Sequence, residues 1–153
     1  MSKKQIAVLI LIAAIAVFFV VRIIRNAMTS EEAKIKKLIK ELAEDFEQKK
    51  FKKIFDHITD DYKDEGGNTK ESLKEDAKLV LAFVNEIKVS ISDLRVVVSS
   101  DKKNAEARFS AKVYLQAKFG DQNINEPMIF HLRRESGEWM LYKSNLQQYG
   151  EGL

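Results

Sequence analysis

Asp56 and His57 are the neighbouring side chains whose types and spacing could support acid–base chemistry. A carboxylate beside an imidazole can orient the ring while the ring exchanges a proton near neutral pH. Tyr62 could add a hydroxyl group at the mouth of the same site. The alternative is structural, because His57 also borders an apolar helical stripe and Tyr62 can act as a capping hydroxyl. We favour that alternative, and we predict catalysis by these three residues only if the protein is an enzyme.

Four carboxylates follow closely, at Asp60, Asp61, Asp64 and Glu65. Calcium takes about six to eight oxygen ligands, so such a cluster could hold that ion. The spacing is not that of an EF-hand loop, and we therefore predict a solvated acidic turn and no metal site. The chain has no cysteine, which excludes a disulfide framework and thiolate ligands. No cofactor is predicted, because Gly66-Gly67 opens no phosphate-binding motif.

The N-terminal segment is apolar over a length that can cross a membrane. Residues 6–21 form an unbroken apolar run, and Ile23 and Ile24 extend it past Arg22. A helix of roughly 20 residues, rising about 1.5 Å per residue, crosses the hydrocarbon core. A cleaved signal peptide would need a well-placed small-x-small site, which is missing here, and a core helix would not be apolar on every face. We predict an uncleaved anchor that contacts the lipid bilayer from Ile6 to Ile24.

The distribution of charge separates this anchor from the rest of the chain. The net charge is +3, but Lys3, Lys4, Arg22 and Arg25 flank the apolar run, and all 23 acidic residues lie at Glu31 or later. Removing those four from the 26 basic residues leaves 22 against 23 acids, a balance of −1. We therefore predict no nucleic-acid role for the domain after the anchor.

The short N-terminal tail predicts the orientation. Basic residues lie on both sides of the span, so the positive-inside rule does not decide alone. A tail with two lysines is awkward to translocate, which favours the N-terminus inside. We predict residues 1–28 as the tail and anchor of a single-pass membrane protein. The domain of residues 29–153 would then lie outside the cytoplasm, and a cytoplasmic domain is the alternative.

Helical periodicity dominates the first half of this domain. Thr29 and Glu32 form a capping-box pattern that predicts the start of a helix. Apolar residues then recur at helical spacing in three segments: Ile35, Leu38, Ile39, Leu42 and Phe46; Phe51, Ile54, Phe55 and Ile58; and Leu73, Ala77, Val80, Val84 and Ile87.

A polar loop is predicted between the second and third of these segments, over residues 59–68. Asn68 and Glu71 resemble the cap of the third helix. Three further apolar residues widen the stripe of that helix and predict burial on more than one side: Leu79, Leu81 and Phe83.

From Lys88 onward the apolar period changes to two, which indicates strands. A bulge is predicted at Asp93, a turn over residues 99–104, and the clearest half-buried strand over residues 105–119. A hairpin turn follows at residues 120–123, and Ser136-Gly137 makes the next turn. The predicted fold is therefore α+β, with about three helices packed on a curved, mostly antiparallel sheet of about four or more strands.

The hairpin predicts which side chains face the helices. If Phe119 opposes Ile124, Val113 lies opposite Phe130. None of the predicted inward residues can transfer a proton, whereas Tyr114 and His131 fall on the outer face. Trp139 is expected mainly as a core anchor. The residues predicted to line a ligand cavity are Phe109, Val113, Leu115, Met128, Phe130, Leu132 and Trp139.

The order and spacing of these elements resemble the nuclear transport factor 2 superfamily, which includes the SnoaL-like proteins. The resemblance rests on the long first amphipathic helix, on "KKIFDHITDDYKDEGG", on "IKVSISDLRVVV" and on "FHLRRESGEWMLYKS". It implies a sheet curled around a conical cavity, which members use as an active site, a ligand pocket or a filled core. An anchor joined to such a domain also resembles the inner-membrane scaffold of bacterial type IV secretion, although this chain is short for that family. That resemblance implies a location in a bacterial inner membrane.

Two functions follow as hypotheses. The first is a membrane-tethered, non-catalytic binding or assembly module that engages an apolar ligand, a membrane-protein partner or a second copy of the chain. The second is a SnoaL-like isomerase, dehydratase or hydrolase that uses Asp56, His57 and Tyr62. The apolar character of the predicted cavity favours the first.

Overall fold

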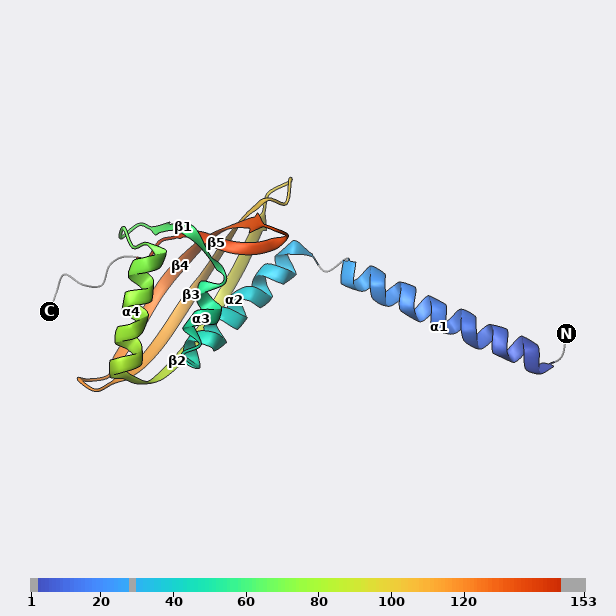
Figure 1. Ribbon diagram of the computed structural model, residues 1–153, viewed down its shortest axis with the longest axis horizontal. Coiled ribbons are helices and arrows are strands. Elements are labelled where there is room, and N and C mark those ends of the chain that lie inside the picture. Colours follow the sequence, from blue (N-terminus) through green and yellow to red (C-terminus); the bar gives the residue numbers. More distant parts are fainter. Residues whose placement is uncertain (1–2, 28–29, 147–153) are drawn as a thin grey trace. The chain divides into compact units, whose positions relative to one another are not determined.

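The computed structural model describes residues 3–27 and 30–146, and it divides the chain into two units, Met1–Ser30 and Glu31–Leu153. The first unit contains the helix α1, Lys3–Ala27 (Figure 1). The segment Lys3–Arg22 has a mean hydropathy of 2.7, and none of it is buried. An exposed apolar helix of this length is consistent with a signal anchor or a signal peptide. The predicted capping residue Thr29 and the predicted domain boundary lie outside the described residues.

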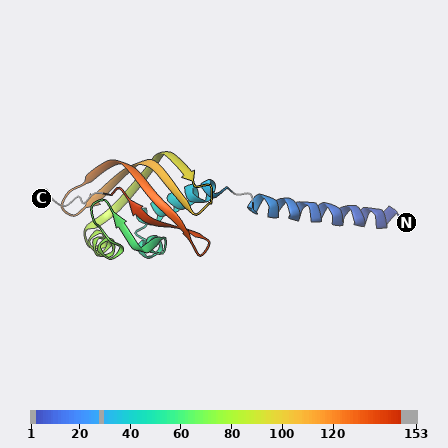
Figure 2. The same cartoon turned by 90° about the horizontal axis from the view of Figure 1, so that it is seen from above.

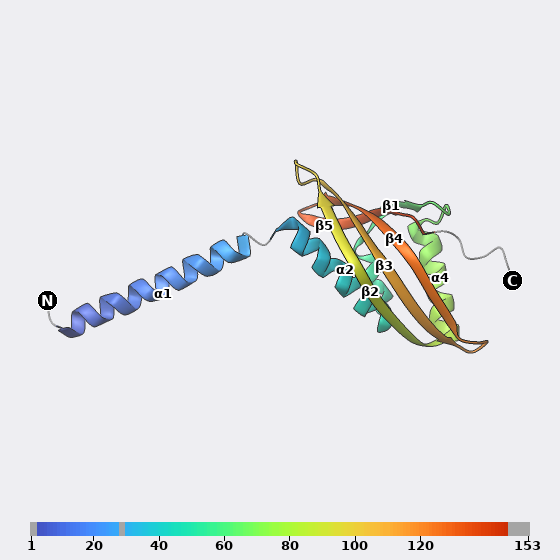
Figure 3. The same ribbon diagram turned by 180° about the vertical axis from the view of Figure 1, so that it is seen from behind.

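The second unit combines helices with a curved sheet of five strands. Figure 2 shows the helices on one face of the sheet, and Figure 3 shows the opposite face. The strand order is β1-β5-β4-β3-β2, with β1 parallel to β5 and every other pair antiparallel. The predicted α+β class is therefore confirmed. The elements are α2 (Glu31–Glu47), α3 (Phe51–Phe55), β1 (Ile58–Asp64), α4 (Lys70–Phe83), β2 (Val84–Val98), β3 (Asn104–Ala117), β4 (Gln122–Glu135) and β5 (Glu138–Ser144).

The main core lies between α2 and the middle of the sheet. Ile35 and Ile39, one turn apart on α2, are fully or almost fully buried against Ala107 of β3 and Leu132 of β4. The helix lies closest to β2, whose Val96 is buried in the same core. At one end of this core Trp139 of β5 is also buried. The predicted apolar stripe of α2 is thus the face that holds the helix on the sheet.

The segment that was predicted as a polar loop is mostly a strand, and that prediction was wrong. Ile58–Asp64 forms β1, which pairs in parallel with β5 at the edge of the sheet. Its buried side chains include Thr59, Tyr62 and Asp64, so polar residues occupy inward positions that an apolar pattern does not reveal. Backbone hydrogen bonds to a distant strand, rather than local sequence, decide this structure.

The boundaries of α4 also differ from the prediction. Thr69, not Asn68, caps the helix, because its hydroxyl accepts from Ser72 N while Ser72 Oγ accepts from Thr69 N. Asn68 instead donates its backbone and side-chain N–H groups to Asp64. The helix ends at Phe83, and β2 begins at Val84 rather than at Lys88.

The wide apolar stripe predicted for α4 is not buried on two sides. Leu79, Leu81 and Phe83 are 58%, 56% and 40% exposed, and Ala77 is the one described residue of the helix that is buried, at 8% exposure. The helix packs by one narrow face only, against α3, β1 and β2. Phe83 packs on Phe119 of the hairpin turn, with 5.6 Å between ring centroids.

The hairpin of β3 and β4 has a different register from the prediction. Val113 pairs with Ile124 and not with Phe130, and Phe130 pairs with Ala107. Each β3 residue therefore pairs with a β4 residue six positions earlier in the sequence than predicted, since 130 − 124 is 6. Because side chains alternate with a period of two, this even shift leaves every side chain on its predicted face.

Two predicted irregularities are confirmed. Asp93 has φ +55°, and the register of β2 against β3 shifts between Ser92 and Arg95, as expected of a bulge. Ser136 and Gly137 both have positive φ between the paired residues Glu135 and Glu138. Positive φ at both central residues is the geometry of a tight two-residue hairpin turn.

Candidate functional site

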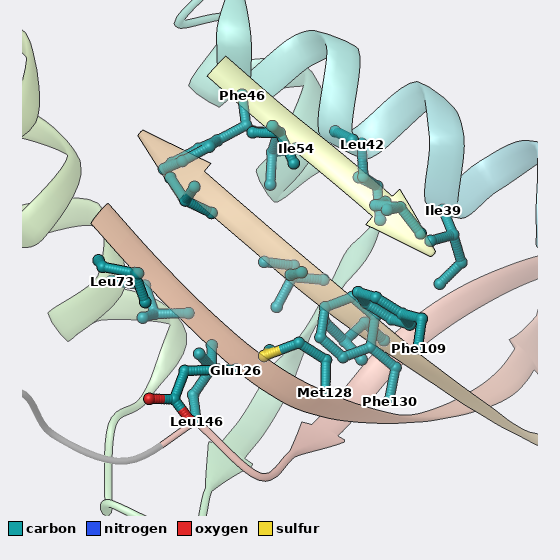
Figure 4. Close-up of a pocket in the computed structure, with 18 of the residues that line it drawn as sticks. Ile39, Leu42, Phe46, Ile54, Leu73, Phe109, Glu126, Met128, Phe130 and Leu146 are labelled. Carbon is teal, nitrogen blue, oxygen red and sulfur yellow. The ribbon is translucent and has the colours of Figure 1, made fainter. Parts of the chain in front are cut away.

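A cavity of about 590 Å³ lies between the helices and the concave face of the sheet. The second unit provides its whole lining among the described residues, and Figure 4 shows the side chains around it. Most of the lining side chains are half-buried rather than fully buried, so the cavity is open to solvent. The core between α2 and the sheet closes one part of this face and leaves the rest uncovered.

The helices form one wall of the cavity. On α2, the stripe that buries Ile35 in the core continues as Ile39, Leu42 and Phe46 into the cavity. Phe46 packs edge to face on Phe51 of α3, at 5.8 Å between centroids. Helical spacing alone thus carries a single apolar stripe from the core into the cavity wall.

Alternate residues of β2, β3 and β4 form the opposite wall. Val89 and Ile91 of β2 pair with Val113 and Ala111 of β3, and all four side chains line the cavity. Deeper in the cavity, the rings of Phe109 and Phe130 stand edge to face, with centroids 5.0 Å apart. The strand period of two therefore builds an apolar surface across three strands.

Five of the seven side chains predicted for a ligand cavity line it: Phe109, Val113, Leu115, Met128 and Phe130. Leu132 and Trp139 do not, since both are buried in the main core with exposures of 0% and 6%. The Nε1–H of Trp139 donates to Glu31 Oε2 at 2.7 Å, as expected of a core anchor. Ligand contact by the five remains a prediction.

Two neutral polar side chains at the cavity already have partners. The Tyr62 hydroxyl is buried and lies 2.7 Å from Ser144 Oγ. Burial raises the pKa of Tyr62 to about 12, so the phenol stays protonated at neutral pH. Asn145 accepts from Ile129 N at 2.8 Å and donates to Pro127 O at 2.9 Å. The Tyr62 hydroxyl is therefore engaged with the Ser144 side chain, and the Asn145 amide with the backbone of β4.

Two acids at the cavity were missed by the sequence-based prediction. Glu126 of β4 and Asp76 of α4 both line the cavity. The inward face of the sheet was predicted to carry no proton-transferring group, and Glu126 shows that this was wrong. The signal was present, because Glu126 lies two positions before Met128 and therefore on the same face of the strand.

The three residues considered for catalysis are not assembled at the cavity. Tyr62 lines it, but Asp56 and His57 are not among the described lining residues. Asp56 is exposed and borders a separate groove between α3 and α4. The His57 carbonyl accepts from Leu141 N at 2.8 Å, which ties the end of α3 to β5.

The acidic segment after His57 is divided among separate partners. Asp61 forms a bidentate pair with Arg133 of β4, at 2.7 and 3.0 Å. That guanidinium lowers the pKa of Asp61, chiefly through the hydrogen bonds. Asp64 is buried, and its carboxylate accepts a hydrogen bond from the side-chain amide of Asn68, so it is not solvated as predicted. Within residues 3–27 and 30–146, no three His, Asp or Glu side chains are arranged to hold a metal ion.

The outer face of the sheet carries Tyr114 and His131, as predicted from strand alternation. The Tyr114 hydroxyl donates to Asp121 at 2.9 Å, on the exposed surface. The centroid of the His131 ring lies 6.3 Å from the centroid of the Tyr142 ring. These residues lie on the opposite side of the sheet from the cavity.

No protein-family model matches the chain, and no curated protein matches it. Solved structures do match the second unit. A Novosphingobium aromaticivorans protein provisionally named scytalone dehydratase has a TM-score of 0.67 at 11% identity, covering 73% of this chain and 79% of that protein. A second protein of that organism, provisionally named an aromatic ring hydroxylase, has a TM-score of 0.66 at 18% identity, covering 76% and 87%.

A third match is from Xanthomonas campestris and is provisionally named a calcium/calmodulin dependent protein kinase II association domain. Its TM-score is 0.63 at 14% identity, covering 78% of this chain and 89% of that one. Identities this low establish the fold and not the activity. The second unit therefore has the nuclear transport factor 2-like, or SnoaL-like, fold, whose members include both enzymes and binding or association domains.

Proposed function

We propose that this chain is a membrane-tethered, non-catalytic binding module that holds an apolar ligand in the cavity of its C-terminal unit. The cavity is the observation that carries this proposal. Its volume of about 590 Å³ falls in the range of roughly 300–1,000 Å³ typical of small-ligand sites. Of its 27 described lining residues, 23 are apolar, the exceptions being Tyr62, Asp76, Glu126 and Asn145.

Open apolar surface gives such a ligand its driving force. Each Å² of apolar surface removed from water contributes about 25 cal/mol. The half-buried Val113, Leu115 and Met128 would lose their remaining contact with water when a ligand fills the cavity. A ligand with a matching apolar body would therefore bind without any rearrangement of the main core.

The apolar helix α1 supports the tether. Its described side chains are exposed, and a helix of this composition is stable when lipid surrounds it. We propose an uncleaved anchor with the N-terminus in the cytoplasm and the C-terminal unit on the other side of the inner membrane. A membrane-protein partner or a second copy would bind through the outer face of the sheet, since the cavity opens on the other face.

Ligand binding is testable at a single methyl group. Full-length protein in lipid nanodiscs, labelled with ¹³C at the methionine methyl groups, is titrated with neutral 1-octanol. The Met128 methyl signal should shift in a saturable way, because Met128 lines the cavity. Ala111→Leu should weaken this binding at least about tenfold by filling the cavity. Lys112→Leu adds the same side chain on the exposed outer face and should not.

A Met128 signal that never shifts, or one that shifts equally in both leucine variants, would overturn the ligand proposal. The tether has its own test, alkaline extraction of membranes followed by mass spectrometry of the intact chain. We expect the protein to stay with the membrane and to keep residues 1–28. Release after extraction, or loss of those residues, would contradict an uncleaved anchor.

The position of Glu126 in the cavity lining is the observation that favours the alternative function, an enzyme. A carboxylate on an apolar wall can act as a general base toward a bound ligand. This alternative predicts that Glu126→Gln abolishes turnover while 1-octanol still binds. Asp56→Asn should leave such turnover intact, since Asp56 borders the separate groove.

A further inference from the structure

The polar groups of the cavity differ in whether the protein satisfies them. Tyr62 is hydrogen-bonded to the Ser144 side chain, and Asn145 is hydrogen-bonded to the backbone of β4. The carboxylates of Glu126 and Asp76 have no hydrogen bond or ion pair with any residue that the structure describes. These two carboxylates are therefore the groups available to a ligand.

Glu126 lies on the sheet wall of the cavity. It is half-buried and pairs with Ala111 across the strands, so its neighbour is too small to cover it. Ile124 and Met128 flank it on the same face of β4. In Figure 4 it is the only charged residue among those labelled, near Leu73, Met128 and Leu146. Its carboxylate thus stands beside an apolar surface.

Asp76 lies on the helix wall, at the exposed edge of the cavity. It follows Leu73 by three residues and precedes Val80 by four on α4, and these two residues also line the cavity. Helical spacing therefore places Asp76 on the cavity-facing stripe, and its exposure places it at the solvent edge of that stripe. No lysine or arginine is among the described lining residues, so the charge of the lining is entirely negative.

We propose that this cavity selects amphiphilic cations, with the apolar body against the sheet, a protonated amine or quaternary ammonium group at Glu126, and Asp76 adding negative charge at the solvent edge. This inference rests on the proposed ligand-binding function and names the ligand class. An ionised carboxylate only accepts hydrogen bonds, so a protonated amine can donate to it, whereas a quaternary ammonium group is attracted to it by charge alone. A ligand that fills the cavity displaces water from beside Glu126, and charges interact more strongly where water is excluded. The same field repels fatty-acid anions.

Three ligands with the same eight-carbon chain separate charge from apolar contact: octylammonium, 1-octanol and octanoate. They are titrated into the full-length protein in zwitterionic nanodiscs, and the Met128 methyl signal reports occupancy of this cavity alone. We expect octylammonium to bind about tenfold more tightly than 1-octanol, and octanoate to bind more weakly than 1-octanol. Salt should reduce the preference for octylammonium and leave 1-octanol unchanged.

Glu126→Gln should bring octylammonium close to 1-octanol in affinity, and Asp76→Asn should produce a smaller loss in the same direction. Glu138→Gln is the matched control, because it removes one exposed negative charge outside the cavity lining. Equal binding of octylammonium and 1-octanol to the unaltered protein would overturn the charge preference while the proposed function stands. If none of the three ligands shifts the Met128 signal, the proposed function itself fails.

An unchanged preference in both Glu126→Gln and Asp76→Asn would also refute the assignment. Folding of each variant is checked by the signal of the Trp139 indole N–H, which is buried in the main core away from the cavity. Because the two acids lie on different walls, one variant remains informative if the other does not fold.

Discussion

Glu31 of α2 is hydrogen-bonded to Trp139 of β5, and this contact allows a quantitative prediction for a substitution of Glu31. Its side chain is 14% exposed and accepts a hydrogen bond from Trp139 Nε1 at 2.7 Å. The other carboxylate oxygen pairs with Lys34 at 3.0 Å and lies 3.6 Å from Arg134. We expect Glu31→Gln to destabilise the C-terminal unit, because it removes the charge from this hydrogen bond and keeps its shape.

The magnitude follows from the two kinds of hydrogen bond. A bond to a charged group contributes about 1.5–3 kcal/mol and a neutral one about 0.5–1.5. The glutamine oxygen can still accept from Trp139, so the loss is the difference, roughly 1–1.5 kcal/mol. A negative charge in the first turn of a helix adds about 0.3 kcal/mol or more. The expected total is about 1.5 kcal/mol, or a fall in Tm of roughly 4–6 °C.

The contribution should depend on pH with a definite sign. The Trp139 hydrogen bond, followed by Lys34, lowers the pKa of Glu31 below 4.5 in the folded state. A lowered carboxyl pKa stabilises the fold above the unfolded value, and this contribution is lost as pH falls through the folded pKa. The difference between the unaltered protein and Glu31→Gln should therefore be full at pH 7 and shrink below about pH 4.5.

Thermal unfolding of the full-length protein in non-ionic detergent measures this difference. Fluorescence of Trp139, the single tryptophan, reports the contact, and circular dichroism reports the whole fold. Glu32→Gln is the control, because Glu32 is in the same helical turn, is 49% exposed and pairs with Lys36. Our reasoning is refuted if Glu31→Gln is no more destabilising than Glu32→Gln, or if its effect is undiminished at pH 3.

Three further predictions concern other parts of the unit. Tyr62→Phe removes the buried contact with Ser144 and should cost about 1–2 kcal/mol in urea unfolding. It should also reduce the loss of stability above pH 10, because the pKa of Tyr62 is raised from 10.0 to about 12 in the folded state and the stability that this contributes is lost as pH rises between those two values. Leu132→Ala, at a side chain with 0% exposure, should cost about 2–5 kcal/mol in the same assay. Gly137→Ala should lower the free energy of unfolding by about 1–2 kcal/mol. The cause is the φ of +82° alone, since an added Cβ meets no atom within 4 Å. A smaller loss of stability in Gly137→Asn would support this cause, and equal losses in the two variants would contradict it.

Hydrophobic periodicity along the chain is enough to predict most of the architecture. The α2 stripe, the alternation along β3 and the change of period near Lys88 predict the helices and the antiparallel strands, although they miss β1 and place the start of β2 four residues late. They also specify which faces turn inward, and the predicted faces are correct despite a six-residue error in the hairpin register. They are correct because a strand has a period of two and the error is even. The apolar surface of the cavity was predictable for the same reason.

Tertiary structure decided what local pattern could not. Ile58–Asp64 is a strand because β5 supplies its hydrogen bonds, and Arg133 meets Asp61 across 72 residues of sequence. The approach of Glu126 and Asp76 to one cavity depends on how α4 lies against the sheet. Contacts between residues distant in sequence depend on the path of the whole chain, whereas helix and strand periods are local properties of the backbone. The sequence therefore determined faces and periods, and the folded chain determined which charged groups share a site.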